Sequence, residues 1–342
     1  MSKISIIEGK TIYYLAPDYD IPSWGNAILY AHVKLLNKNG INAKILHHQS
    51  PFRYSWFQSD VPILYLNDPE LKISKEDYLV VPEVNILDNE PQKIKCNKIV
   101  FIQGGFLILL KMQKAQDFSA LGYNHVIVTM PNIKKIVDTH FGAKAYIIPA
   151  YIAPYFFINN EDLKKERSKT VLLFPKDVYR QLGQLDYDIL KKMLDRRFAN
   201  NAKKLLGLIT RQDKSKWHMV ELRGKTHLEV ASIMKESSFF VCVNTVEGFN
   251  VAVPEAMAAG CIPICYDAYG GDDYLEDNVN AFVFKNNYIY PLLEKLFYLM
   301  DNYDNIQDEL SQIRKNGYNT ALRYTEKQME ESLLEFYTGI IN

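Results

Sequence analysis

Two glutamates, Glu247 and Glu255, stand eight positions apart in the stretch TVEGFNVAVPEAMAAGC. A Gly-Phe-Asn turn follows the first glutamate, and Pro254 directly precedes the second. Proline suits the first turn of a helix, and the positive end of the helix dipole favours a carboxylate there. That carboxylate can accept both hydrogen bonds of a vicinal diol, such as a ribose. Each acid alone has an ordinary explanation, as a solvated loop residue or a helix-start acid, but together they predict a polar ligand held at two points.

The elements around this stretch must bring it to a binding edge. The apolar run SFFVCVN ends at Asn244 and the run CIPICYD begins at Cys261, and both predict buried strands. In a parallel sheet covered by helices, ligands gather at the carboxyl ends of the strands, where the loop after Asn244 begins. Gly248 allows a tight turn in that loop and a close approach of the backbone to a ligand.

Two sets of apolar runs alternate with helical segments, which predicts an α/β protein with two parallel sheets. The strand candidates of the first set are TIYYLAP, NAKILHH, YLVVPE, KIVFIQ, HVIVTM and AYIIPA, and those of the second are VLLFP, KLLGLIT, HMVELRG, SFFVCVN, CIPICYD and AFVF. The expected helices are Gly25–Asn39, ended by Gly40, then Tyr187–Phe198, His227–Lys235, Pro254–Ala259 and Ile289–Met300.

The chain of 342 residues has room for two domains, each with a core of its own. The charged segment Asn159–Thr170 has few apolar residues and is expected to link them. The tail carries one apolar face that predicts an amphipathic helix, formed by Met329, Leu333, Leu334 and Tyr337.

The composition is that of an ordinary soluble globular protein, with 48% hydrophobic and 23% charged residues. Lys and Arg number 40, as do Asp and Glu, so bulk charge gives no reason to expect nucleic-acid binding. Four cysteines without a C-x-x-C pair are expected to be buried thiols in a reducing cytoplasm. The apolar run Ile99–Met112 is too short to span a bilayer, and it predicts a strand, a glycine turn and a helix start.

The motif and its flanks resemble a known family. E-G-F-x-x-x-x-x-E-A-M-A-x-G is similar to the donor-site signature of retaining nucleotide-sugar glycosyltransferases with the GT-B fold, of the type numbered family four. The stretches GGDDYLEDNVNAFVF and PDYDIPSWGNAILYAHVKLLNKNG resemble further parts of that family. The resemblance implies two Rossmann-like doubly wound domains facing a cleft: an acceptor-binding domain at 1–165, a donor-binding domain at 166–325, and a C-terminal helix at 326–342 that packs on the first domain.

The resemblance also assigns roles around the two glutamates. Glu255 would bind the ribose hydroxyls of the nucleotide, and Glu247 would be the catalytic-site acid beside the transferred sugar. Phe249, Asn250 and Val251 would surround that sugar. The family usually carries glycine where this chain has Asn250, so the sugar contacts are where the chain departs from the pattern.

The diphosphate of a nucleotide sugar requires positive charge. In the segment LLFPKDVYRQLGQ, where the family places an Arg and a Lys, Lys176 and Arg180 stand four positions apart and can share one anionic ligand if the segment turns. Arg223 lies in a stretch similar to the family's base-binding loop and is a further donor-site candidate. Gly25 matches the loop glycine that approaches the diphosphate and the sugar.

Other chemistries find less support in the sequence. Many relatives place a histidine after a central strand of the first domain, but the matching stretch FIQGGF offers Gln103, so no catalytic histidine is predicted. We find no convincing Ser-His-Asp set, zinc cluster or glycine-rich phosphate loop. Two Asp-Tyr-Asp stretches, 18–20 and 186–188, are typical of metal-dependent glycosyltransferases of another fold, which the whole pattern disfavours. No metal ion or other cofactor is therefore expected.

The sequence predicts a cytoplasmic retaining glycosyltransferase that moves a sugar from a nucleoside-diphosphate sugar to a glycan or lipid-linked acceptor. A weak peripheral contact of the first domain with the inner membrane face is left open, and nucleic acid is not an expected partner. Two alternatives also stay open: a non-catalytic nucleotide-sugar binding protein, and a sugar-nucleotide epimerase with the same two-sheet fold. The sugar, the base and the acceptor are not determined at this point.

Overall fold

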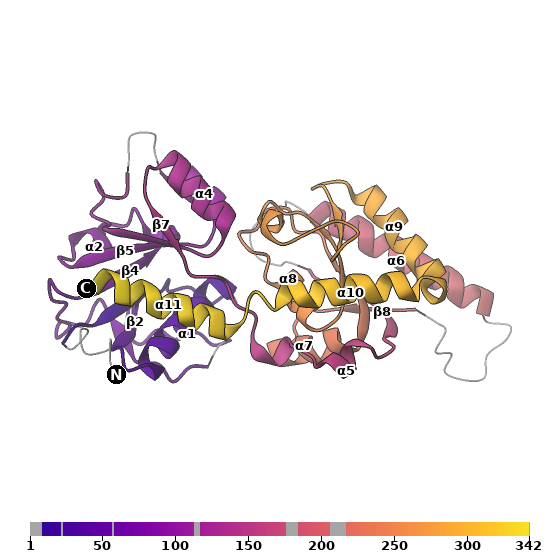
Figure 1. Cartoon of the computed structure of the whole chain (residues 1–342), viewed down its shortest axis with the longest axis horizontal. Coiled ribbons are helices and arrows are strands. Elements are labelled where there is room, and N and C mark those ends of the chain that lie inside the picture. Colours follow the sequence, from indigo (N-terminus) through magenta and orange to yellow (C-terminus); the bar gives the residue numbers. More distant parts are fainter. Residues whose placement is uncertain are drawn as a thin grey trace. The chain divides into compact units, whose positions relative to one another are not determined.

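The computed structural model describes residues 9–21, 23–56, 58–112, 117–175, 184–205 and 217–341, with the backbone alone at 200–205 and 341. The chain divides into two compact units, Met1–Ala150 with Lys327–Asn342 and Tyr151–Glu326. Figure 1 shows a parallel sheet with flanking helices in each of them.

Unit 1 contains a seven-stranded sheet in the order β3-β2-β1-β4-β5-β6-β7, and its strands pair in parallel. The strands are β1 (Ile12–Leu15), β2 (Ala43–His47), β3 (Ile63–Tyr65), β4 (Tyr78–Pro82), β5 (Asn97–Ile102), β6 (His125–Val128) and β7 (Ala145–Ile147). The helices between them are α1 (Trp24–Lys38), α2 (Asn89–Lys93), α3 (Gly105–Lys111) and α4 (Pro131–His140). The chain reverses its direction across the sheet between β1 and β4, so the carboxyl ends of these strands form a topological switch point.

Apolar runs explain the centre of this sheet. Every residue of β4 is buried, and β5 is buried after Asn97, as expected for strands covered on both faces. Helix α1 buries Ile28, Val33 and Leu36 on one side, and Gly40 ends it with a φ of 77°. The predictions for this helix and for its glycine terminator are confirmed.

The last helix, α11 (Glu326–Ile341), runs along unit 1 and is the yellow ribbon that ends at C in Figure 1. Its Glu330 accepts hydrogen bonds from Lys38 at 3.0 Å and from Asn39 at 2.7 Å. In the interior, the hydroxyl of Tyr337 lies 2.9 Å from that of Tyr14. Met329 and Leu333 are buried as well, so the predicted apolar face is the one that packs.

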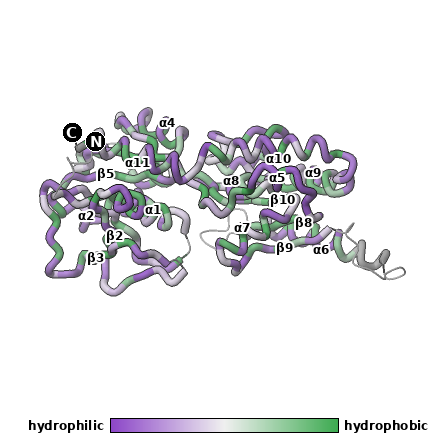
Figure 2. Tube along the Cα trace, turned by 60° about the horizontal axis from the view of Figure 1, so that its bottom comes forward, coloured by the Kyte–Doolittle hydropathy of each residue, from purple (hydrophilic) through white to green (hydrophobic). Residues whose placement is uncertain are grey.

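Unit 2 contains a five-stranded parallel sheet in the order β12-β11-β10-β8-β9. Its strands are β8 (Ser168–Leu173), β9 (His218–Glu221), β10 (Ser237–Cys242), β11 (Ile262–Tyr266) and β12 (Phe282–Phe284). The helices are α5 (Asn160–Leu163), α6 (Gln184–Leu205), α7 (His227–Glu236), α8 (Ala252–Ala258), α9 (Ile289–Asn302) and α10 (Gln307–Ala321). Figure 2 shows hydrophobic residues along the central strands β8 and β10.

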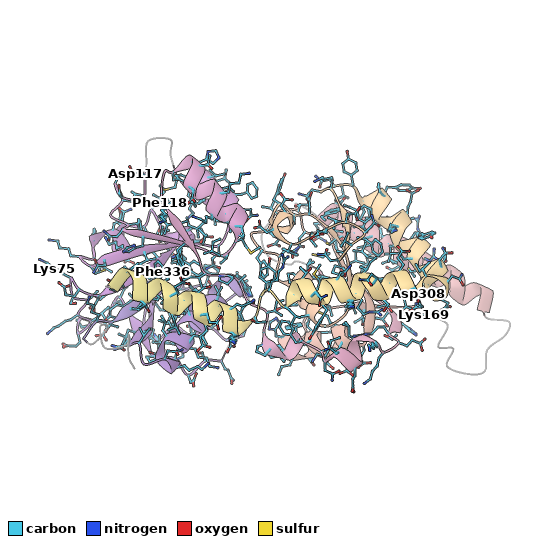
Figure 3. The ribbon with its side chains drawn as sticks, viewed as in Figure 1. Lys75, Asp117, Phe118, Lys169, Asp308 and Phe336 are labelled. Atoms are coloured by element: carbon cyan, nitrogen blue, oxygen red, sulfur yellow. The ribbon has the colours of Figure 1, made fainter. Side chains whose placement is uncertain are left out.

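The strand order again reverses at the centre, because β9 lies on one side of β8 and β10 on the other. The carboxyl ends of β8 and β10 therefore form the switch point of unit 2. Lys169, labelled in Figure 3, marks the opposite, amino end of β8, where its ammonium pairs with Asp304 at 2.8 Å.

The expected boundary at 165/166 is too late in the chain, since the division falls between Ala150 and Tyr151. The expected linker 159–170 is also wrong, because it contains helix α5 and the start of β8. The residue before this segment, Ile158, is anchored in unit 2. Its N–H donates to the Ala258 carbonyl at 3.3 Å, and its carbonyl accepts a bond from the Tyr318 hydroxyl at 2.6 Å. Low apolar content was therefore a poor sign of a linker here.

The remaining expectations for unit 2 are met with one exception. Strands at β8 to β12 and helices at α7, α8 and α9 stand where they were expected, within a few residues, whereas α6 begins three residues before the predicted helix and ends seven residues after it. The exception is the strand expected at KLLGLIT (204–210), because residues 204 and 205 end helix α6 and the rest lies outside the described residues. In the described part of the chain, no helix combines the length and apolar character needed to cross a membrane.

Candidate functional site

The loop after β10 places Glu247 at the switch point of unit 2. Its backbone N–H donates to the Ala268 carbonyl at 3.0 Å, and its Oε1 accepts a bond from the Asn244 side chain at 3.0 Å. Asn286 ties the same loop to the neighbouring one, since its amide donates to the Thr245 carbonyl at 2.7 Å and accepts from the Ala268 N–H at 3.3 Å. Glu247 is therefore held by backbone and side chain at the carboxyl edge of the sheet.

Asn250 occupies a backbone conformation that explains its relation to glycine. Its φ is 52°, in the left-handed region where glycine is favoured and asparagine is the best-tolerated alternative. Its side chain is buried and lies 3.7 Å from the Cys242 sulfur. The departure from the family pattern at Asn250 thus keeps the turn that glycine would form, and the amide packs on β10.

Close packing around this turn fixes its shape. A side chain at Gly270 would collide with the carbonyl oxygens of Glu247 and Gly248, so only glycine fits there. Ala268 and Tyr269 both have positive φ, at 50° and 63°, which is a strained arrangement for residues with side chains. Two consecutive strained residues beside Glu247 are typical of a ligand-binding loop.

Phe249 packs inward beside the turn. Its ring lies 4.9 Å from that of Tyr324 and 5.6 Å from that of Tyr274, and the Tyr274 hydroxyl donates to the Phe249 carbonyl at 3.0 Å. Val251 is half-buried and precedes helix α8. The loop residues predicted to surround a sugar are therefore together in one turn, with the phenyl ring serving as its anchor.

Glu255 is the fourth residue of α8, and its side chain is only 5% exposed. Its Oε1 lies 2.9 Å from Nε2 of His227, the first residue of α7. Nδ1 of the same ring lies 2.6 Å from the hydroxyl of Tyr155. An ionised Glu255 only accepts hydrogen bonds, so a neutral His227 carries its proton on Nε2 and accepts from Tyr155 at Nδ1.

The electrostatics of this pair are coupled. Burial raises the pKa of Glu255 above its usual value, and the bond from His227 offsets part of that increase. Burial lowers the pKa of His227, but the hydrogen bond and the charge of Glu255 outweigh it, so the pKa of His227 also lies above its usual value. The two side chains therefore behave as a carboxylate and an imidazole that share protons as one unit.

Unit 1 has its own set of polar groups at the carboxyl edge of its sheet. Gly25 lies at the start of α1, and its carbonyl accepts a bond from the side chain of Gln103, directly after β5, at 3.1 Å. A side chain at Gly25 would lie 2.8 Å from the Gln103 oxygen. The structure thus brings together the glycine predicted to face the donor and the residue that stands where relatives have histidine.

Glu83 lies beside them, after β4, and is fully enclosed. Its Oε1 accepts the backbone N–H of Gly104 at 2.9 Å. Burial raises the pKa of Glu83 to about 7, although backbone hydrogen bonds and the charge of Lys111 lower it in part. A glutamate with a pKa near neutrality at a switch point is a candidate functional group in its own right.

Of the other predicted donor-site residues in unit 2, Arg223 lies within the described part of the chain. Arg223 lies in the loop after β9, and its Nε donates to Glu221 at 3.1 Å. Glu221 also accepts from Lys191 at 2.6 Å. Lys176 and Arg180 lie outside the described residues, so their placement is not part of the site described here.

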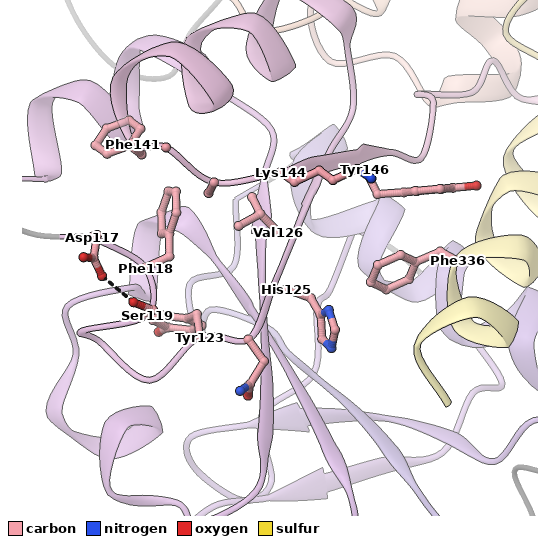
Figure 4. A pocket seen from close by; sticks show the side chains of 13 residues that line it. Asp117, Phe118, Ser119, Tyr123, His125, Val126, Phe141, Lys144, Tyr146 and Phe336 are labelled. Atoms are coloured by element: carbon pink, nitrogen blue, oxygen red, sulfur yellow. Dashed lines mark hydrogen bonds between the residues drawn. The ribbon is translucent and has the colours of Figure 1, made fainter. Parts of the chain in front are cut away.

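A cavity in unit 1 lies away from these groups. It has a volume of about 450 Å³ and lies at the amino ends of β6 and β7. Its lining residues His125, Tyr146 and Phe336 face one another (Figure 4). This is the opposite edge of the sheet from Gly25, Gln103 and Glu83. Among the residues that the structure describes, no three His, Cys, Asp or Glu side chains gather to hold a metal ion.

Comparisons with known proteins agree with this arrangement. Residues 207–320 match the family model for glycosyl transferases group 1. An alpha-1,6-glucosyltransferase of Actinobacillus pleuropneumoniae is 26% identical over 334 residues, which cover 93% of this chain and 92% of the relative. Together with the two parallel sheets, these similarities indicate a glycosyltransferase with the GT-B fold.

Solved structures of this fold cover nearly the whole glycosyltransferase. A glycosyltransferase from Rickettsia africae superimposes with a TM-score of 0.68 at 14% identity, over 98% of this chain and 99% of that one. HepE from Anabaena, solved in complex with UDP-glucose, superimposes with a TM-score of 0.64 at 11% identity, over 96% and 99%. The predictions of the GT-B fold and of a glycosyltransferase are confirmed.

Two polar residues of the site were missed by sequence reasoning. His227 lies in the stretch that resembles the family's base-binding loop, but the prediction for that stretch named Arg223. Glu83 is the last residue of the strand candidate YLVVPE, at a carboxyl end, where an acid is a recognisable signal. Their partners, Glu255 and Gly104, are 28 and 21 positions away, so pairing was not visible from sequence spacing.

Proposed function

We propose that this glycosyltransferase is retaining and transfers glucose from UDP-glucose to a glycan or lipid-linked acceptor. The observation that carries the proposal is the pair of glutamates at the unit 2 switch point, with Glu247 in a strained loop and Glu255 buried at the start of α8. The choice of donor is supported by the relative named as a glucosyltransferase and by HepE, whose structure contains UDP-glucose.

Each glutamate has a separate task in this proposal. Glu255 accepts hydrogen bonds from the ribose hydroxyls, and Glu247 faces the hydroxyls of the transferred glucose, beside the backbone of Phe249, Asn250 and Val251. Lys176 and Arg180 neutralise the diphosphate, and Arg223 contributes on the nucleotide side. Gly25 gives the donor a close approach to unit 1. Because two cations serve the diphosphate, the proposal includes no metal ion.

The reaction conserves the configuration at the anomeric carbon. The bond between C1 of glucose and the oxygen of the β-phosphate breaks, and a bond from C1 to the acceptor oxygen forms on the same face. The acceptor hydroxyl gives its proton to the departing diphosphate. The enzyme contributes by positioning the two substrates and by stabilising negative charge on the leaving group.

The acceptor is expected to bind at unit 1. Helix α3 supports a weak peripheral contact of this unit with a membrane, because Leu110 is 80% exposed and Leu109 beside it is also exposed. Such a contact would suit a lipid-linked acceptor, whereas a free glycan would not need it. Binding to vesicles with and without the acceptor lipid would separate the two.

The nascent anomer of the product tests the proposal. The protein is incubated with UDP-glucose in the absence of an acceptor, so that water takes the acceptor's place, and released glucose is followed by proton NMR before it equilibrates. A retaining enzyme releases α-glucose first, since the donor is the α-anomer. Early release of β-glucose would exclude retention.

A panel of donors sharpens the assignment of the sugar and base. UDP-glucose should raise the Tm more than UDP-galactose or ADP-glucose, since a ligand at 100 times its Kd stabilises the folded state by about 2.7 kcal/mol. Stabilisation by all three to the same degree would contradict specific recognition of UDP-glucose. Appearance of a C2 epimer of the free donor would instead identify an epimerase, and binding with no turnover of any donor would indicate a non-catalytic protein.

A further inference from the structure

His227 bonds the carboxylate that is expected to bind ribose, although the donor motif itself does not include it. The ring is anchored at several points. Its Nε2 lies 2.9 Å from Glu255, its Nδ1 lies 2.6 Å from the Tyr155 hydroxyl, and the ring of Phe156 packs against it at 4.9 Å. Tyr155 and Phe156 belong to one short helical turn, Pro154–Phe156.

The backbone at His227 is fixed as well. Thr226 caps helix α7 by accepting the Glu229 N–H, and the Glu229 carboxylate accepts the Thr226 N–H at 2.7 Å. This reciprocal capping box sets the direction in which the first residue of the helix leaves the loop. The imidazole therefore reaches Glu255 from a defined position and not from a free surface rotamer.

The environment of the pair favours a binding role over a purely structural one. The Glu255 side chain is 5% exposed, whereas that of His227 is 51% exposed. A buried carboxylate needs partners for its oxygens, and a carboxylate offers about four acceptor positions, of which His227 uses one. The half-exposed His227 ring uses one acceptor position of the buried Glu255 carboxylate. The remaining positions can accept hydrogen bonds from a ligand with hydroxyl donors.

We propose that His227 is a positioning residue for nucleotide recognition: it holds the Glu255 carboxylate ionised and oriented, so that this carboxylate can accept both hydroxyls of the donor's ribose. Tyr155 supports this role by donating its hydroxyl proton to Nδ1 of the neutral ring, which leaves the ring proton on Nε2, facing Glu255. The inference rests on the proposed function, because it assumes that Glu255 binds the ribose.

Among the described residues, two tyrosines lie near the pair. Tyr155 and Tyr151 face Glu255 from the segment before α5, and burial raises the pKa of each to about 12. The charge of Glu255 adds to this increase for both, and that of Glu326 adds to it for Tyr151. Helix α10 packs on α8 too, but its Arg314 binds the Gly260 carbonyl beyond the end of α8. Near neutral pH, His227 and Glu255 are thus the groups of this cluster that change charge.

The test measures the Kd of UDP by calorimetry between about pH 5 and pH 8.5 with the full chain. His227→Ala should weaken UDP binding about tenfold near neutrality, as expected for one charge-assisted hydrogen bond. It should also move the acid limb of the binding profile to higher pH, because the carboxylate loses the partner that opposes its protonation. A structural role alone would lower the Tm without moving this limb.

Three further variants make the result interpretable. His227→Gln keeps a donor without a titrating ring and should restore most of the affinity, and it serves if the alanine variant folds poorly. Tyr155→Phe should weaken binding only about two- to threefold, since it removes the support and not the contact. His218→Ala, an exposed histidine of the same unit, should change nothing.

Glu255→Gln is the reference variant for the whole series. Because it has no titrating carboxyl at position 255, the pH dependence of UDP binding that it keeps includes the titration of the diphosphate itself. If Glu255→Gln weakens UDP binding while His227→Ala leaves both affinity and acid limb unchanged, the inference is overturned and the donor site stands. Tighter binding by His227→Ala would mean that the ring blocks the ribose site, which also overturns it. If neither variant affects UDP, the donor assignment of Glu255 itself fails.

Discussion

Glu83 of unit 1 and Glu255 of unit 2 are both buried glutamates at the switch point of a parallel sheet, but their carboxyls have different partners. The Gly104 backbone N–H donates to Glu83, whereas the imidazole of His227 bonds Glu255. A backbone donor is fixed by the fold and does not titrate. An imidazole can change its charge.

This difference in partners suggests different uses for the two acids. Glu83 secures the turn at Gly104, next to Gln103, whose side chain binds the Gly25 carbonyl, so it shapes the edge of unit 1. The partner of Glu255 is His227, whose charge changes with pH. We therefore expect changes at Glu83 to appear mainly in stability and changes at Glu255 mainly in donor binding.

The largest effect is expected in the pH dependence of stability. The pKa of Glu83 is raised from 4.5 to about 7 in the folded state, so the folded protein holds a proton that the unfolded chain has lost between these values. Stability should fall as pH rises from about 4.5 to about 7, by up to about 3 kcal/mol from this group. Glu83→Gln should remove the part of the slope that comes from this group, measured by urea unfolding across the pH range. The part that comes from Glu255 and His227, whose pKa values are also raised, should stay.

The matched control for this experiment is Glu76→Gln, an exposed acid of the same unit. It should leave the pH slope of stability as it is in the wild type. A slope as steep in Glu83→Gln as in the wild type would show that Glu83 holds no extra proton in the folded state, and the comparison with Glu255 would lose its basis. UDP affinity should stay within about twofold in Glu83→Gln if the two acids have separate tasks.

The second prediction separates Glu255 from Glu247 within unit 2. A charged hydrogen bond contributes about 1.5–3 kcal/mol, so each Gln variant should change one kinetic parameter by roughly ten- to a hundredfold. Glu255→Gln should raise the Kd of both UDP-glucose and UDP, because the ribose is bound alike before and during the reaction. Glu247→Gln should lower kcat and leave UDP affinity nearly intact.

Calorimetry with UDP and initial rates with UDP-glucose distinguish these outcomes. The reverse pattern, in which Glu247→Gln abolishes UDP binding and Glu255→Gln does not, would exchange the two roles. Unchanged behaviour of both variants would leave the motif without a function in donor binding. Glu294→Gln, an exposed glutamate on α9 of the same unit, is the control for a nonspecific loss of charge.

Much of this architecture could be predicted because it depends on local patterns. Short stretches of sequence are enough to recognise the apolar runs at β4, β5, β10 and β11 and the helix-ending glycine at position 40. The boundary at Ala150 was missed because residues 151–165 join unit 2 through tertiary bonds, such as that between Ile158 and Ala258. The bond between His227 and Glu255 was missed for the same reason, since the tertiary fold brings α7 and α8 together.

The smallest effect is expected at Asn250, where the turn beside Glu247 differs from the family pattern. Its φ of 52° is accessible to glycine without strain and to asparagine at little cost, whereas alanine is disfavoured there by about 1 kcal/mol. Asn250→Gly should therefore leave stability within about 0.5 kcal/mol, while Asn250→Ala should lower it by about 1 kcal/mol or slightly more, because the buried contact with Cys242 is also lost. Urea unfolding gives both values, and kcat measured on the same samples reports whether the turn still presents Glu247.

Equal destabilisation by glycine and alanine would mean that the amide contact, and not the backbone conformation, is what asparagine contributes. In that case, unit 2 would depend on a side-chain bond at a position where we assign the constraint to the backbone.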